Sequence, residues 1–143
     1  MTVSTAESCT GGELSLLMTS VPGSSNYFTG GIVTYATQKK IDLLHVSEGT
    51  IERFTVVSEE VAREMAEGCQ NLFQTDISIS TTGVAGPGKG EDGKDIGLIY
   101  YTIKVKNQSE TFKLFLPHLE RKDFVYFVSQ KIIQDLVGIL IRK

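Results

Sequence analysis

The chain has 143 residues, 41% of them hydrophobic, and a formal net charge of −3. This length fits one domain with a hydrophobic core. No run of Lys or Arg is present, and nucleic-acid or membrane-surface binding needs a concentrated basic patch. We therefore expect a small-molecule partner, with no nucleic acid and no membrane.

The two cysteines, Cys9 and Cys69, have no metal-ligand spacing around them, so we expect reduced thiols and no metal site. Cys9 could be a nucleophile at a helix start, but a small buried filler is the favoured interpretation. We find no stretch long and apolar enough to span a bilayer and no leader before the first strand. These features predict a cytoplasmic protein.

The first predicted strand, over residues 2–5, leads into a turn and then an apolar-periodic helix. The first N–H groups of a helix have no internal partner and favour an anion. Gly11 and Gly12 would let the backbone approach a phosphate or an oxyanion beside Ser8 or Thr10. The alternative is that Ser8 or Thr10 is only an ordinary N-cap.

Strand and helix signals alternate early and give way to a hairpin. They predict a single three-layer α/β/α-type domain, with a mixed sheet and a long C-terminal helix. The remaining predicted elements are a strand over 28–36, a helix over 38–44 capped by Thr37, a helix from Glu59 capped by Ser58, a strand over 76–81, strands over 96–105 and 111–116 joined by a turn at 107–109, and a helix over 121–141.

A loop over residues 82–90 holds four glycines and a proline. It matches neither the dinucleotide fingerprint nor the Walker A spacing, so it could be a flexible surface connection. The functional interpretation is a backbone cradle for an anionic ligand at the carboxyl end of a strand.

Parallel strands would bring Ser8, Tyr35 and Lys40 to one rim together with this loop. A lysine can act as a base for a serine only if burial or a neighbouring cation lowers its pKa, and Lys39 is adjacent in sequence. The spacing alone favours the alternative, a solvated surface lysine.

Several ordered blocks resemble the CinA C-terminal domain family, whose single-domain members include bacterial nicotinamide-nucleotide amidases. The resemblance covers nearly the whole chain. The blocks are Ser8–Gly12, Val21–Ser25, Phe28–Tyr35 with Lys40, Val57–Ala62 and Thr82–Pro87.

The resemblance implies hydrolysis of the carboxamide of nicotinamide mononucleotide to nicotinate mononucleotide and ammonia, without a metal or cofactor. It implies that Ser8 is the nucleophile, that Lys40 is the base and that Tyr35 orients Ser8 or the nicotinamide ring. N–H groups around Thr10, Gly11 and Gly12 would hold the oxyanion.

The 5′-phosphate would need its own donors. We assign to it Thr82, Gly83, Gly86, Gly88 and Arg121.

The chain departs from the family pattern at three places, which bear on ligand contacts. Thr37 replaces an asparagine, Asp95 replaces a proline, and residues 117–121 form a longer segment before Arg121.

The resemblance also bears on organisation. We expect residues 1–143 to form one CinA C-terminal-like domain without the family's usual first helix, and the parent chain could carry an N-terminal domain. A thinly covered sheet would favour a homo-oligomer. The alternative function is a non-catalytic nucleotide-binding regulatory domain.

Overall fold

The computed structural model describes residues 1–90 and 92–142. Its strands and helices follow in the order β1 (Val3–Glu7), α1 (Glu13–Thr19), the short 3₁₀ helix η1 (Ser24–Asn26), β2 (Phe28–Val33), α2 (Thr37–Leu44), α3 (Glu48–Phe54), α4 (Glu59–Phe73), β3 (Ile77–Gly83), β4 (Leu98–Val105), β5 (Gln108–Phe115) and α5 (Arg121–Arg142).

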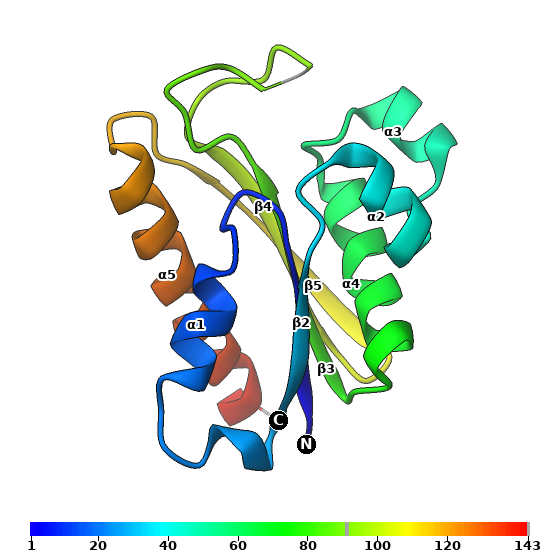
Figure 1. The fold of residues 1–143 in the computed structure, drawn as a ribbon, viewed down its shortest axis with the longest axis vertical. Helices are drawn as coiled ribbons and strands as arrows, with labels where there is room; N and C mark the ends of the chain where they lie inside the picture. The colour runs from blue at the N-terminus through cyan, green and yellow to red at the C-terminus, as the bar shows by residue number, and fades with distance from the viewer. Residues whose placement is uncertain (91, 143) are drawn as a thin grey trace.

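The strands form one five-stranded sheet in the order β2-β1-β3-β4-β5. β1 pairs in parallel with both β2 and β3, whereas β4 and β5 add antiparallel strands at the other side. Helices α1 and α5 cover one face and α2, α3 and α4 the other (Figure 1). The predicted fold class, three layers around a mixed sheet with a long final helix, is confirmed.

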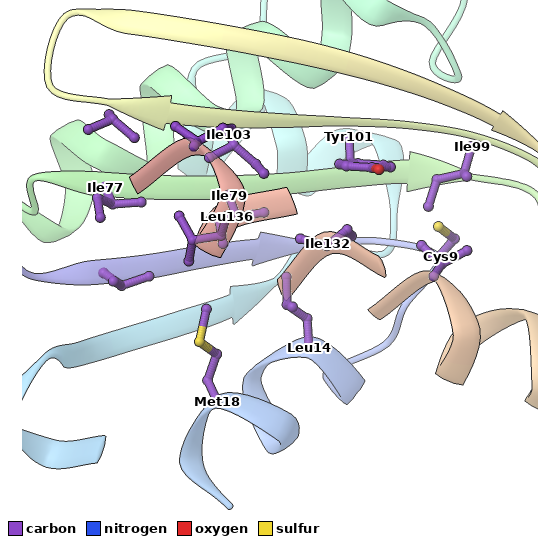
Figure 2. Packing of buried hydrophobic residues seen from close by; sticks show 14 of the residues in the cluster. Cys9, Leu14, Met18, Ile77, Ile79, Ile99, Tyr101, Ile103, Ile132 and Leu136 are labelled. Atoms are coloured by element: carbon purple, nitrogen blue, oxygen red, sulfur yellow. The ribbon is translucent and has the colours of Figure 1, made fainter. Parts of the chain in front are cut away.

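The larger part of the core lies between the sheet and the helices α1 and α5. Figure 2 shows Leu14 and Met18 of α1 and Ile132 of α5 among the buried apolar side chains of the strands. A second cluster between the sheet and α2 and α4 includes Leu44 and Met65. The burial of β3 between both layers explains why its first six residues are all buried.

Several boundaries differ from the sequence predictions, most clearly around β2, α2 and the hairpin. β2 ends at Val33, and α2 begins at Thr37 with Ala36 as its N-cap, so Thr37 is not the cap. The hairpin turns at Lys106 and Asn107, while Gln108 already belongs to β5. Lys106 has a φ of 54°. A tight two-residue hairpin turn requires a positive φ, which is usually supplied by Gly, Asn or Asp, so a lysine at this position gave no sequence signal for the turn.

Helix α3 was not predicted from the sequence. It has only seven residues, and its N-cap, Ser47, accepts a hydrogen bond from the N–H of Thr50. A helix this short carries too little hydrophobic periodicity to be detected, because it completes barely two turns.

The expectation that no stretch could span a bilayer is wrong by length and composition, because α5 meets both criteria. Within the domain, however, one face of α5 is part of the core: Phe124, Val128 and Ile132 are fully buried. Length and composition alone do not separate such a core helix from a membrane span.

Candidate active site

The loop after β3 and the first turns of α2 and α5 meet at the carboxyl end of β1 (Figure 1). Ser8 directly follows β1, and Gly11 and Gly12 have φ values of 58° and 103° before α1 begins. Two consecutive residues in the left-handed region explain the glycine pair, since a side chain at either position would be strained.

Lys40 brings its side-chain amine to Ser8. Its side chain is 1% exposed, and its Nζ donates to Ser8 Oγ at 3.0 Å. The same nitrogen donates to the carbonyl oxygens of Thr34 at 2.7 Å and Tyr35 at 3.1 Å. The predicted meeting of Ser8 and Lys40 at one rim is therefore present, and the alternative of a solvated Lys40 is wrong.

This geometry suits a serine–lysine pair chemically. Carbonyl oxygens can only accept, so those of Thr34 and Tyr35 take two N–H bonds of Lys40 whether its amine is charged or neutral. The position that faces Ser8 Oγ can then be a third N–H bond or the lone pair of the neutral amine. Removal of water from a buried amine favours the neutral form, which a general base requires.

Lys39, which the sequence analysis offered as a neighbouring cation for Lys40, has an exposed side chain paired with a carboxylate. Its exposed ammonium is 3.5 Å from a carboxylate oxygen of Asp42. Successive helix residues point in different directions, which explains why one lysine is buried and its neighbour is not.

A cavity of about 320 Å³ opens in front of Ser8 and Lys40. Its walls come from the β1–α1 turn, the start of α2, residues 82–90 and Arg121. Among the described lining residues three are basic, namely Lys40, Lys89 and Arg121, and none is acidic. In a chain with a net charge of −3, this local excess of positive charge favours an anionic ligand.

Arg121 connects two walls of the cavity. It is the first residue of α5, and its guanidinium donates to the carbonyl oxygen of Gly86 at 2.5 Å and to the Tyr35 hydroxyl at 2.7 Å. The Tyr35 side chain is 59% exposed. Tyr35 thus contacts Lys40 through its carbonyl and Arg121 through its hydroxyl, and a hydroxyl contact with Ser8 is not among its hydrogen bonds in the described part of the chain.

The other residues assigned to a phosphate also line the cavity: Thr82, Gly83, Gly86 and Gly88. Thr82 Oγ1 already donates to the carbonyl oxygen of Val56 at 2.9 Å, so it can only accept further bonds. A Cβ on Gly83 would lie 2.6 Å from the carbonyl oxygen of Leu98, whereas one on Gly88 would meet nothing within 4 Å.

The three positions noted as departures from the family pattern all lie at or next to residues that line the cavity. Thr37 lines the cavity. Asp95 forms an exposed ion pair with Lys89 at 3.9 Å. The longer segment at 117–121 still delivers Arg121 to the rim.

The contacts of Thr10, Gly11 and Gly12 in the structure differ from the predicted role of these residues in holding an oxyanion. Gly11 N–H donates to the carbonyl oxygen of Ser8 at 3.0 Å, and Gly12 N–H donates to Glu7 Oε1 at 3.2 Å. The hydroxyl of Thr10 donates to the same carboxylate oxygen at 2.6 Å. An internal anion therefore occupies the helix start that the sequence assigned to a ligand.

Glu7, Thr34 and Thr81 are parts of the site that the sequence analysis missed. Glu7 and Thr81 sit within or at the end of buried strands, where polar residues carry no periodic signal. Thr34 contributes only a carbonyl oxygen to Lys40, which no side-chain pattern can reveal.

Cys9 borders the cavity, but it is 6% exposed and burial raises the pKa of its thiol to about 12. A thiol in this state is a poor nucleophile at neutral pH, because the thiolate is the reactive form. The interpretation of Cys9 as a buried filler is supported. Neither His45 nor His118 lines the cavity, and the described residues contain no cluster of metal-ligating side chains.

Comparison with known proteins places this site in a family context. The CinA C-terminal domain model matches residues 1–137. A CinA-like protein of Petrotoga mobilis is 48% identical over 139 residues, which is 95% of this chain and 34% of that protein. Protein MG115 of Mycoplasma genitalium is 41% identical over 135 residues, 94% of this chain and 85% of that protein.

Solved structures agree with these relatives. A competence or damage-inducible protein of Enterobacter asburiae has a TM-score of 0.94 at 32% identity, with 98% of this chain and 87% of that chain covered. A CinA superfamily protein of Klebsiella pneumoniae 700603 has a TM-score of 0.95 at 29% identity, with 99% and 88% covered.

The chain spans only about a third of the length of the CinA-like relative from Petrotoga mobilis, and 27% of one from Fusobacterium nucleatum, which is 51% identical over 79% of this chain. The range that the family model covers, residues 1–137, includes Ser8, Lys40 and Arg121. Because the family model covers residues 1–137, the chain belongs to the CinA C-terminal domain family.

Proposed function

We propose that this domain is a nicotinamide-nucleotide amidase, which hydrolyses nicotinamide mononucleotide to nicotinate mononucleotide and ammonia. The observation that carries the proposal is the 3.0 Å contact between the buried Lys40 Nζ and Ser8 Oγ at the floor of a basic cavity. An amidase of this kind needs a hydroxyl nucleophile beside a base. It needs no metal or cofactor.

In the proposed acylation, the neutral amine of Lys40 takes the proton of the Ser8 hydroxyl while Oγ forms a bond to the carboxamide carbon. The C–N bond then breaks as Lys40 returns the proton to the leaving nitrogen, which departs as ammonia. The product of this half-reaction is an ester of nicotinate mononucleotide on Ser8.

In the proposed deacylation, Lys40 takes a proton from water, whose oxygen attacks the ester carbon. The C–O bond to Ser8 breaks, the serine oxygen recovers the proton from Lys40, and nicotinate mononucleotide leaves. One base therefore serves both steps, as in other covalent hydrolases.

The phosphate of the substrate would lie against Arg121 and residues 82–88. Arg121 has five N–H donors, and two contacts in the structure, to Gly86 and Tyr35, leave donors for an anion. The positive lining of the cavity supports this assignment, and it would distinguish nucleotides from uncharged amides.

The test is ammonia release from nicotinamide mononucleotide by the purified protein. Ser8→Ala and Lys40→Ala should abolish it while circular dichroism remains unchanged. Lys39→Ala is the matched control, because it removes an exposed lysine paired with Asp42 and should retain activity. A wild-type protein that binds the nucleotide but releases no ammonia would be a nucleotide-binding regulatory domain instead.

We also propose a cytoplasmic homo-oligomer. Reduced thiols at Cys9 and Cys69 fit that compartment. The outer face of α5 exposes the large apolar side chains of Tyr126, Phe127 and Val137, which a second copy could cover. Light scattering that gives a monomer at micromolar concentration would refute the oligomer.

A further inference from the structure

We propose that Glu7 is a positioning residue for Ser8 and acts through the hydroxyls of Thr10 and Thr81. The inference rests on the proposed amidase function, to which it adds three residues that are not among those lining the cavity. It starts from a buried carboxylate that the reaction described above does not use.

Glu7 is 0% exposed and has hydrogen-bond donors on both carboxylate oxygens. Oε1 accepts from the Thr10 hydroxyl at 2.6 Å, from Gly12 N–H at 3.2 Å and from Leu14 N–H at 2.9 Å. Oε2 accepts from the N–H of Ser15 at 2.9 Å and from its hydroxyl at 2.6 Å. Every one of these partners is a donor, so the Glu7 carboxylate takes part in these bonds only as an acceptor.

This carboxylate fixes the direction of a chain of hydrogen bonds. The single hydroxyl hydrogen of Thr10 points to Glu7, so Thr10 Oγ1 can only accept from Thr81 Oγ1, which lies 2.9 Å away. The hydroxyl hydrogen of Thr81 is thereby directed to Thr10, and the Cys9 side chain is a further hydrogen-bond partner of Thr81. Thr81 Oγ1 in turn accepts from the Ser8 N–H at 3.1 Å.

The chain therefore runs from Ser8 N–H through Thr81 and Thr10 to the Glu7 anion, and each bond polarises the next. It holds the backbone N–H of Ser8, while Lys40 Nζ contacts the Oγ of the same residue. A nucleophile must be held within a fraction of an ångström of its attack geometry, and a misplacement of about 1 Å can cost about 100-fold in rate.

The test compares two substitutions that interrupt this series of hydrogen bonds with matched controls. Thr81→Val removes the acceptor of Ser8 N–H at nearly constant volume, and Glu7→Gln removes the charge that sets the direction. Thr81→Ser restores the hydroxyl. Thr102→Val is the control, because Thr102 is likewise a buried threonine in a hydroxyl pair, with Thr111 at 2.8 Å, but this pair joins β4 to β5 and does not include Ser8.

We expect Thr81→Val and Glu7→Gln to lower kcat for ammonia release about 10- to 100-fold with KM nearly unchanged. Thr81→Ser should recover most of the rate, and Thr102→Val should keep it. Exchange of the Ser8 amide hydrogen, followed by NMR, should accelerate in both broken variants. If Glu7→Gln does not fold, the Thr81 pair alone decides.

The inference is overturned if folded Thr81→Val keeps kcat and amide protection at Ser8, or if Thr81→Ser is as slow as Thr81→Val. A wild-type protein that releases no ammonia would refute the proposed function instead. In that case, hydrogen exchange at the Ser8 amide still tests the series of hydrogen bonds from Glu7 to Ser8. Unchanged exchange in Thr81→Val and Glu7→Gln would overturn the inference, and faster exchange would support it.

Discussion

Arg121 Nη2 donates to the Tyr35 hydroxyl across 2.7 Å, although the two residues are 86 positions apart in the chain. The contact joins the start of α5 to the segment between β2 and α2, and the second bond of Arg121, to Gly86, adds the loop after β3. Three separate segments thus converge on one guanidinium at the rim of the cavity.

We predict that Arg121→Gln raises KM for nicotinamide mononucleotide by about tenfold or more, since a charge-assisted bond to a phosphate contributes roughly 1.5–3 kcal/mol. The effect on kcat should be smaller. Steady-state ammonia release from the mononucleotide and from the uncharged riboside measures the difference, because the riboside has no phosphate to lose contact with.

Arg142→Gln is the matched control for Arg121→Gln. Arg142 is the last residue of the same helix and pairs with Glu110 at 2.6 Å, outside the cavity. A KM for the riboside that rises as much as that for the mononucleotide would contradict the assignment of Arg121 to the phosphate.

Both cysteines should resist alkylation in the folded protein. Burial raises the pKa of Cys9 from 9.0 to about 12 and that of Cys69 from 9.0 to about 11, so almost no thiolate exists at pH 8. Mass spectrometry after iodoacetamide treatment at pH 8 should find neither residue modified in native protein and both modified in urea. Rapid labelling of native Cys9 would contradict the assignment of Cys9 to the core.

The same thiols predict loss of stability in alkali. Their pKa values are higher in the folded than in the unfolded chain, so their contribution is complete below about pH 9 and decreases as the pH rises toward 11 and 12. Urea unfolding between pH 8 and 10 measures the slope, which Cys9→Ala should reduce if the variant folds.

Asp76 should make the fold sensitive to acid. The N–H of Thr2 donates to its Oδ2 at 2.8 Å and holds the pKa of this carboxyl below its ordinary value of 3.8. A depressed pKa stabilises the fold above the unfolded pKa, and the contribution is lost as the pH falls through the folded one. Asp76→Asn should therefore be less stable than wild type at pH 7 and converge with it in acid, as urea unfolding at each pH would show.

The elements with strong local signals were predictable from the sequence. Ser58 does cap α4, accepting from the N–H of Val61, and α5 begins at Arg121 as its hydrophobic period indicates. The nearness of Ser8 and Lys40 followed from the rule that parallel strands end at one edge of a sheet.

What the sequence could not reveal depends on tertiary partners. Glu7 occupies the amides before α1 because its strand delivers the carboxylate there, and no spacing rule marks such a contact. The burial of Lys40 likewise depends on the backbone carbonyl oxygens of Thr34 and Tyr35. Every residue has such a carbonyl group, so the sequence does not show which ones will accept from a lysine.

The close packing of α2 against α4 at Gly68 should affect both the stability of the fold and the position of Lys40. A Cβ on Gly68 of α4 would lie 1.9 Å from the carbonyl oxygen of Leu44, the last residue of the helix that carries Lys40. Gly68→Ala should force the two helices apart and destabilise the fold by about 1–3 kcal/mol or more. If it folds, kcat should fall as well, because Lys40 moves with α2.

Gly138→Ala is the matched control for this substitution. Gly138 also lies inside a helix, α5, but a Cβ there would meet nothing within 4 Å. Alanine loses less backbone freedom on folding than glycine does, so this variant should be more stable than wild type by about 0.5–1 kcal/mol. Thermal unfolding of both variants checks the pair: equal shifts in Tm would mean that α2 and α4 do not pack closely at Gly68, and the placement of Lys40 would then need another support.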